Sequence, residues 1–302
     1  MNTITRNKIF KQVIRFMQKQ VSQWFLGAAL VGFPLATFAL VVCLMSSPLQ
    51  LPFTEDDELT SITLLPNFSA INQTPARKEQ FLAMLRPLVD EKNAKLLKSR
   101  ERLLKIKAEW ETAQTITGVN QRNLEKLREK FHVTHETYPD DDKAIEILLL
   151  RVDAIPSSMV LAQAAVESGW GTSRFAEEAH NLFGHWCYKP GCGLIPGQRR
   201  LGATHEVKKF NNVEESITAY FNNINTHNAY RAWRQLRAQL RDQPQAFTGV
   251  NMVAELGKYS GRGNAYIQEL RKVIRSNRLE QSALGLANQQ ANQQANQQTI
   301  AD

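Results

Sequence analysis

The chain has 302 residues, of which 43% are hydrophobic and 22% charged, and a formal net charge of +8. This length and hydrophobic content supply material for one substantial domain with appendages. The charge does not indicate a nucleic-acid-binding protein, because five basic residues are concentrated at the N-terminus: Arg6, Lys8, Lys11, Arg15 and Lys19. What remains is a mildly basic surface, which fits an anionic polymer or an ordinary solvated surface.

Residues 1–24 are a basic segment without an acidic residue, and residues 25–46 are an apolar run without any charge. A run of this length can cross a bilayer as a helix. A cleaved signal peptide is the alternative, but its apolar core is usually about 7–15 residues long and ends in a small-x-small site, which residues 44–48 match poorly. We therefore expect a single-pass inner-membrane anchor, with residues 1–24 in the cytoplasm and the catalytic domain in the periplasm.

Residues 47–75 mix Pro, Ser, Thr, Asn and acidic residues, which is typical of a linker. Residues 76–139 then show apolar positions at helical spacing. Pro87 is expected to kink or break the first helix, and a second helix is predicted from Asn120 to Phe131. This helical segment can either pack on the domain that follows or form a short stalk.

The acidic run at residues 140–142 lacks the Gly turn and distal Glu of a calcium-binding loop. We expect it to cap a helix from Lys143 to Val152 instead.

The stretch Ile155–Gly171 predicts one bounded helix of about three turns, because Pro156 suits the first position and Gly169 suits the exit. Its residues leave no wide polar stripe, so the helix should be buried nearly all round. Glu167 lies at its far end, where burial and the negative end of the helix dipole both raise the pKa of a carboxyl group. A carboxyl group that stays protonated near neutral pH is the general acid that a glycosidase needs.

A structural role for Glu167 is the alternative: it can cap a neighbouring backbone group or pair with an arginine such as Arg174. Trp170, three residues after the glutamate, offers the flat apolar face on which a sugar ring can lie.

After a short helix from Ser173 to Ala179, Pro and Gly punctuate residues 185–210, which predicts a small β-hairpin lobe. Cys187 and Cys192 flank a Tyr-Lys-Pro-Gly turn, so the two thiols can approach, and an oxidising compartment favours a disulfide. We expect no metal site, because no second Cys or His pair is present and His205-Glu206 lacks the second His of an H-E-x-x-H motif. No other cofactor is expected.

Helical spacing returns in the last third of the chain. It is carried by Ile217, Tyr220, Phe221 and Ile224, then by Trp233, Leu236 and Leu240, then by residues 250–256 and 265–274. Residues 286–302 contain repeated Ala-Asn-Gln-Gln and are assigned no structure.

Three motifs occur in one order along the chain: Glu167-Ser-Gly-Trp-Gly171, Asn181-Leu-Phe-Gly184 and Asn228-Ala-Tyr230. With them the chain resembles the bacterial peptidoglycan-cleaving N-acetylglucosaminidases, a family that includes autolysins and the flagellar rod-associated muramidase-like protein. The three motifs together are far more specific than any one of them. The resemblance implies a mainly α, lysozyme-like α+β fold, with a glucosaminidase domain over residues 140–285.

The resemblance also implies roles for individual residues. Glu167 is the general acid, and Tyr230 matches the tyrosine implicated in holding the N-acetyl sugar. The expected substrate-binding residues are Ser168, Trp170, Asn181, Phe183 and Gly184. Leu182 and Phe183 can equally fill the core, and a place in the core is the alternative for Tyr230.

The resemblance does not assign the second carboxylate to one residue, since it varies in the family and is usually sought in the β-lobe. Glu206 is the candidate, because Glu214 and Glu215 begin a helix, where acids are expected. Without a second carboxylate, a base-activated water or the substrate's own acetamido oxygen are the open routes.

The sequence therefore predicts a membrane-anchored endo-β-N-acetylglucosaminidase that acts on peptidoglycan glycan strands. A lytic transglycosylase with the same fold and a single glutamate is one alternative. A non-catalytic wall-binding or scaffold protein is another.

Overall fold

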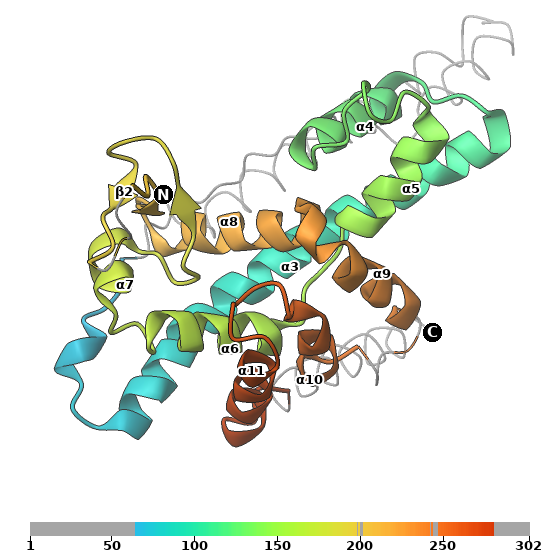
Figure 1. Cartoon of the computed structure of the whole chain (residues 1–302). Coiled ribbons are helices and arrows are strands. Elements are labelled where there is room, and N and C mark those ends of the chain that lie inside the picture. The colour runs from blue at the N-terminus through green and yellow to red at the C-terminus, as the bar shows by residue number, and fades with distance from the viewer. Residues whose placement is uncertain (1–63, 198, 200–201, 242, 244–246, 281–302) are drawn as a thin grey trace, which may run out of the picture. The chain divides into compact units, whose positions relative to one another are not determined.

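The computed structural model describes residues 64–197, 199, 202–241, 243 and 247–280 (Figure 1). The chain divides into two units, 1–52 and 53–302, and every described residue belongs to the second. The predicted cytoplasmic tail, membrane anchor and Ala-Asn-Gln-Gln tail lie outside the described residues and stay predictions. Within the described ranges, no helix is both long and apolar enough to cross a bilayer.

Helices dominate the described chain, and three short strands form a sheet, which fits the predicted mainly α, α+β class. The α-helices are α3 (Thr74–Ala113), α4 (Gly118–Lys130), α5 (Asp141–Arg151), α6 (Ser157–Ser168), α7 (Arg174–Ala179), α8 (Val213–Thr226), α9 (Arg231–Leu240), α10 (Gly249–Met252) and α11 (Asn264–Ser276). The 3-10 helices are η1 (Phe68–Ala70), η2 (Asn228–Tyr230) and η3 (Val253–Leu256). The strands are β1 (Trp186–Cys187), β2 (Gly193–Leu194) and β3 (Glu206–Lys208).

Helix α6 packs against α3, α10 and α11 (Figure 1). Every residue from Met159 to Ala165 is fully buried. The prediction of a helix buried nearly all round is therefore confirmed. The helix ends at Ser168, and Gly169 follows it with φ 58°, as expected for a glycine at the exit. Pro156 was expected at the first helical position but lies at the N-cap, directly before Ser157.

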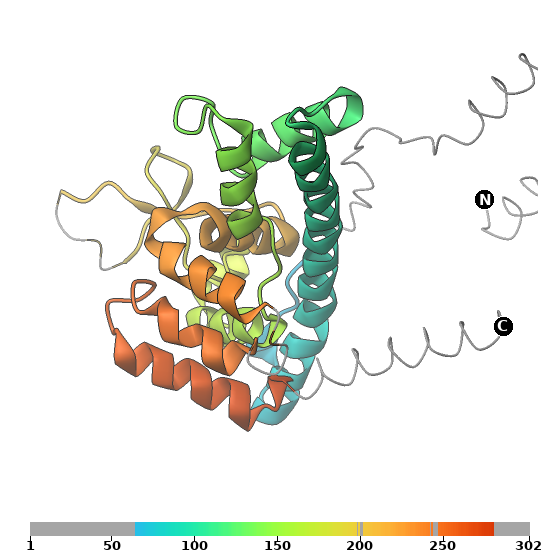
Figure 2. The ribbon, with the colours of Figure 1, turned by 90° about the vertical axis from the view of Figure 1, so that its right-hand side faces the viewer.

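The long helix α3 packs along α5, α6 and α8 and is no separate stalk (Figure 2). Its residues Phe81, Leu85 and Val89 are fully buried in the same core as α6. The expected break at Pro87 is wrong, because α3 continues through it. A proline removes one helical hydrogen bond, and burial of Leu85 and Val89 on either side of it offsets that loss.

The helix predicted after the acidic run is α5. Asp140 occupies its N-cap position, but its side chain makes no capping hydrogen bond. Asp141 and Asp142 lie in the first turn, where the helix dipole favours negative charge. Asp142 accepts a hydrogen bond from the Lys143 amide at 2.7 Å, and Asp141 pairs with Arg128 at 2.8 Å, so the acidic run also stabilises the start of the helix by direct bonds.

The predicted hairpin lobe is a three-stranded antiparallel sheet in the order β1-β3-β2. The central strand places Val207 opposite both Trp186 and Leu194. Gly193 allows this close pairing, since a Cβ there would lie 1.9 Å from the Val207 carbonyl oxygen. A simple hairpin was expected because the two-residue strands β1 and β2 give almost no periodic signal.

A buried arginine holds the loop between α5 and α6. Arg237 donates hydrogen bonds to the carbonyl oxygens of Leu150 (2.7 Å), Asp153 (3.0 Å) and Ala154 (2.9 Å). Burial lowers the pKa of this guanidinium to about 9. The backbone that enters α6 is thus fixed by a side chain from α9.

The turn after α6 is held by a phenylalanine from the start of the described chain. Gly169, Trp170 and Gly171 all have positive φ angles, of 58°, 60° and 79°. The fully buried ring of Phe68 lies so close that a Cβ on Gly171 would come within 2.5 Å of it. The geometry at the end of α6 therefore depends on Phe68.

We predict that Gly171→Ala destabilises the protein by about 2–4 kcal/mol, because it adds a steric clash to the cost of a positive φ. Gly118→Ala is the matched control, since Gly118 has φ 56° with open space around its Cβ position. It should cost only about 1–2 kcal/mol, the strain of a positive φ alone. Equal losses in denaturant unfolding of the two variants would contradict the clash.

Candidate active site

Glu167 lies in the last turn of α6 with its side chain partly buried. Burial raises the pKa of this carboxyl group, while a hydrogen bond with Tyr266 and the positive charge of Arg262 oppose the rise. The charge of Glu269 raises it further. The net shift is upward, as the sequence predicts for a proton donor.

Gly184 borders the Glu167 carboxyl group. A Cβ at Gly184 would lie 3.8 Å from Oε2 of Glu167, and the residue adopts φ 68°. Any larger residue would add both contact with the carboxyl group and backbone strain. Gly184, the last residue of the second motif, therefore leaves space beside the carboxyl group of Glu167, the predicted general acid.

A chain of hydrogen bonds leads from the core to Glu167. The Tyr220 hydroxyl donates to Oε1 of Gln163, and Nε2 of Gln163 donates to the Tyr266 hydroxyl at 2.9 Å. The Tyr266 hydroxyl in turn hydrogen-bonds with Glu167. Because Tyr266 accepts from Gln163, its own hydrogen is free to point at Glu167.

Two further tyrosines complete an aromatic group around the carboxyl group. The ring of Tyr259 stacks on Tyr266 at 5.8 Å, and its hydroxyl donates to the Phe183 carbonyl oxygen at 2.9 Å. Tyr230 lies 6.1 Å from Tyr259. Burial raises the pKa of Tyr230, a hydrogen bond with Asn223 opposes this, and the charge of Glu167 adds to it. Tyr230 is therefore part of the Glu167 environment, and its contact with sugar stays a prediction.

Three of the predicted substrate-binding side chains are engaged within the protein. The Ser168 hydroxyl donates to the Ala164 carbonyl and accepts from the Gly171 amide. Asn181 donates to the carbonyls of His185 and Lys208 and accepts from the His185 amide. The Phe183 ring is buried and stacks on Tyr220 at 4.2 Å.

Trp170 packs toward α3. Its indole meets Phe81 edge-on at 5.9 Å, and the Lys78 ammonium lies 4.8 Å from the ring centre. These contacts fix the turn after α6. A sugar contact of Trp170 stays a prediction.

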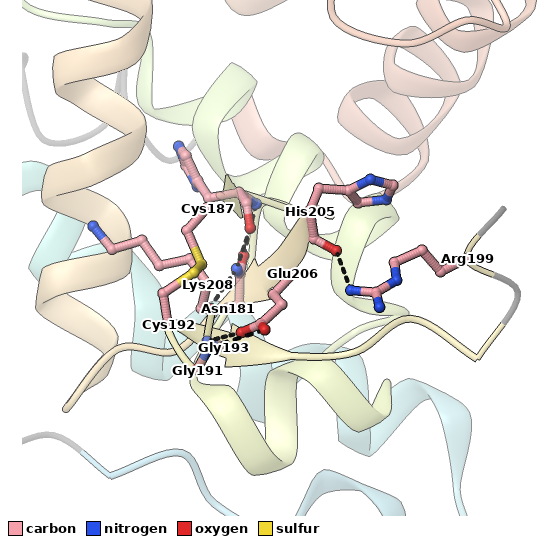
Figure 3. The surroundings of a disulfide bond; sticks show 10 residues. Asn181, Cys187, Gly191, Cys192, Gly193, Arg199, His205, Glu206 and Lys208 are labelled. Atoms are coloured by element: carbon pink, nitrogen blue, oxygen red, sulfur yellow. Dashed lines mark hydrogen bonds between the residues drawn. A yellow bond between two sulfur atoms is a disulfide. The ribbon is translucent and has the colours of Figure 1, made fainter. Parts of the chain in front are cut away.

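Glu206 lies at the base of the disulfide loop (Figure 3). Its carboxylate accepts hydrogen bonds from the amides of Gly191 (3.0 Å) and Gly193 (2.8 Å), and these bonds lower its pKa. Cys187 and Cys192 form the disulfide at the position that the sequence predicts. Glu206 is thus an ionised residue that ties the loop to β3, and its role as second carboxylate stays a prediction.

One group of residues in the described ranges brings candidate metal ligands together: Cys187, Cys192 and Glu206. The two sulfur atoms are bonded to each other, so they offer no thiolate. The donor set therefore does not suit a zinc ion.

His185 is enclosed by aromatic rings behind β1. It lies 6.3 Å from Phe183 and 6.0 Å from Phe210, edge-on to both. Burial, together with the charge of Lys208, lowers its pKa to about 4. The imidazole is therefore neutral at physiological pH and contributes to packing.

Sequence reasoning did not assign Gln163, Tyr259 or Tyr266 to the site. Gln163 carried a signal, because it is the only polar residue between Met159 and Val166 and lies one turn before Glu167 on the same helix face. No sequence pattern indicates Tyr259 or Tyr266, because α6 and the segment around α11 meet only in the folded protein.

Known proteins and families show similarity to this chain. The family model described as mannosyl-glycoprotein endo-beta-N-acetylglucosaminidase matches residues 143–279, which include Glu167 and the surrounding tyrosines. The protein Bax of Escherichia coli strain K12 is 34% identical over 217 residues, which cover 70% of this chain and 74% of Bax. No solved structure gives a significant match.

The chain therefore belongs to the glucosaminidase family, as a Bax-like member. This confirms the resemblance that the three motifs indicate, and the domain is of the glycoside hydrolase type.

We predict that the protein loses stability between pH 6.5 and pH 4 through His185. In that range the unfolded chain binds a proton that the folded imidazole, with a pKa of about 4, does not. The free energy of unfolding should fall by about 2 kcal/mol between pH 7 and pH 5 from this residue alone. Denaturant unfolding of His185→Leu should show a smaller fall. The exposed His227→Gln should keep the full dependence, and an unchanged slope in His185→Leu would contradict the prediction.

Proposed function

We propose that the protein is an endo-β-N-acetylglucosaminidase that hydrolyses β-1,4 bonds of peptidoglycan strands on the reducing side of N-acetylglucosamine. The fold in this proposal is lysozyme-like. One observation carries the proposal: a family-matched domain holds a partly buried glutamate, Glu167, whose pKa is raised and which a glycine leaves uncovered on one side. That environment suits a general acid.

In the proposed reaction, protonated Glu167 donates its proton to the glycosidic oxygen as the bond to the N-acetylglucosamine anomeric carbon breaks. The oxygen of a water molecule finally bonds to that carbon, and a proton of the water returns to the Glu167 carboxylate. Tyr266 holds the carboxyl group in place by its hydrogen bond. Burial keeps the Tyr266 hydroxyl protonated by raising its pKa, so it remains a donor whatever the charge of Glu167. After proton transfer the same hydrogen bond stabilises the carboxylate.

The second catalytic role has two candidates. Glu206 is ionised, as a base or charge-stabilising residue would be, but both of its oxygens already accept hydrogen bonds from the loop. Use of the substrate's acetamido oxygen needs no second carboxylate, and Tyr230, beside Glu167, is suited to orient that group. For these reasons we propose the acetamido route.

We further propose that residues 25–46 anchor the chain in the inner membrane and that the domain works in the periplasm. The disulfide between Cys187 and Cys192 supports this placement, because disulfides persist in oxidising compartments.

The proposal is tested by incubating the purified full chain with peptidoglycan and identifying the soluble fragments by mass spectrometry. We expect fragments that end in reducing N-acetylglucosamine, and a loss of at least about 1000-fold in rate for Glu167→Gln, because the amide cannot donate the proton. Anhydro-muramyl ends would identify a lytic transglycosylase instead. Binding to peptidoglycan without any cleavage by the wild type would identify a wall-binding protein.

We predict that Tyr266→Phe moves the alkaline limb of the pH–rate profile to higher pH. The hydrogen bond with Tyr266 lowers the pKa of Glu167, so its removal raises that pKa. Because a general acid works in its protonated form, activity should then persist to higher pH. The profile is measured as kcat/KM against pH.

Tyr259→Phe is the matched control, since it removes a hydroxyl from the neighbouring stacked ring. That hydroxyl donates to the Phe183 carbonyl and not to Glu167. Its alkaline limb should stay in place even if the rate falls. A limb that moves equally in both variants, or in neither, would contradict the role of Tyr266.

A further inference from the structure

The β-lobe presents a large aromatic side chain to solvent. Trp186 on β1 is 57% exposed. Its indole is nonetheless held in place, because it stacks on the His205 ring at 4.3 Å with an interplanar angle of 20°. One face of the indole is thus supported by the protein.

The support beneath Trp186 is itself fixed. Trp186 pairs with Val207 across the sheet, and the next residue, Cys187, is held by the disulfide. Arg199 donates a hydrogen bond to the His205 carbonyl oxygen at 3.3 Å (Figure 3). The Trp186–His205 stack is therefore a preorganised platform, and little conformational entropy would be lost when a ligand binds to it.

This platform lies close to the candidate acid along the chain. Gly184 borders the Glu167 carboxyl group, and Trp186 follows two residues later. Two residues span at most about 7 Å. A polymer chain that passes Glu167 at Gly184 therefore has the platform within reach of its adjacent units.

The charge of the lobe also indicates the kind of ligand. Lys189, Lys208 and Lys209 are exposed on the lobe. Between residues 185 and 210 the sequence contains one acidic residue, Glu206, whose carboxylate accepts hydrogen bonds from two backbone amides. An exposed aromatic face on a lobe with exposed basic side chains fits a ligand that combines apolar sugar faces with carboxylates.

We propose that the Trp186–His205 stack is a sugar-binding subsite, on which a pyranose ring of a carboxylate-bearing glycan strand lies while a neighbouring bond is held at Glu167. The inference rests on the proposed function, because it takes the peptidoglycan strand as the occupant. Trp186 then binds the glycan strand, and Glu167 transfers the proton.

Binding is measured without turnover, using the full chain with Glu167→Gln and a soluble hexasaccharide of alternating N-acetylglucosamine and N-acetylmuramic acid. Adding Trp186→Ala should weaken the affinity in calorimetry about tenfold, the loss expected for one aromatic face. Trp186→Phe should recover most of it. His205→Ala should give an intermediate loss, because the indole loses its support.

Leu104→Ala is the control, since Leu104 is a 46% exposed apolar residue on α3. It should leave the affinity unchanged. In the otherwise wild-type chain, Trp186→Ala should raise KM on long strands and leave kcat within about twofold, since uniform binding is what it removes.

If adding Trp186→Ala leaves the affinity for the hexasaccharide within about twofold of that of the Glu167→Gln chain, the subsite is overturned, even if the wild type cleaves peptidoglycan. A Trp186-dependent loss of binding to anionic lipid vesicles, with glycan binding unchanged, would overturn it in favour of a membrane contact. If the wild type cleaves nothing but the Trp186-dependent glycan binding is present, the proposed hydrolysis fails and the subsite stands.

Discussion

The burial of one carboxyl group at the end of an apolar helix is the constraint on which the rest of the structure depends. Helix α6 is buried from Met159 to Ala165, so Glu167 at its last turn cannot be fully hydrated. Desolvation raises its pKa, and the surrounding groups moderate that rise and do not cancel it. The cost of this placement is offset by packing of α6 against α3, α10 and α11.

The neighbouring elements serve this carboxyl group in different ways. Phe68 fixes the turn that ends α6, and Gly184 leaves the carboxyl group without a covering side chain. Gln163 orients Tyr266 so that its hydroxyl hydrogen can reach Glu167. The β-lobe is a separate rigid feature, closed by its disulfide and by the backbone hydrogen bonds of Glu206.

Much of this arrangement could be predicted from sequence, because it depends on local chemistry. The boundaries of α6 follow from Pro156 and Gly169, and its burial follows from composition. The disulfide follows from two cysteines around a Pro-Gly turn. What could not be predicted depends on contacts between distant segments: the strand order of the β-lobe, the unbroken helix at Pro87, and Tyr266 beside Glu167. Two-residue strands have no readable period, and tertiary packing overrides the local preference of a proline.

The most direct test of this account is the pKa of Glu167 itself. The carboxyl carbons of the full chain, labelled with ¹³C-glutamate, can be titrated by NMR, and the Glu167 signal is assigned by its loss in Glu167→Gln. The pKa of Glu167 should lie above the ordinary glutamate value of 4.5. A value at or below 4.5 would mean that the carboxyl group is well solvated or paired in the native protein, and Glu167 would then be unsuited to act as the proton donor.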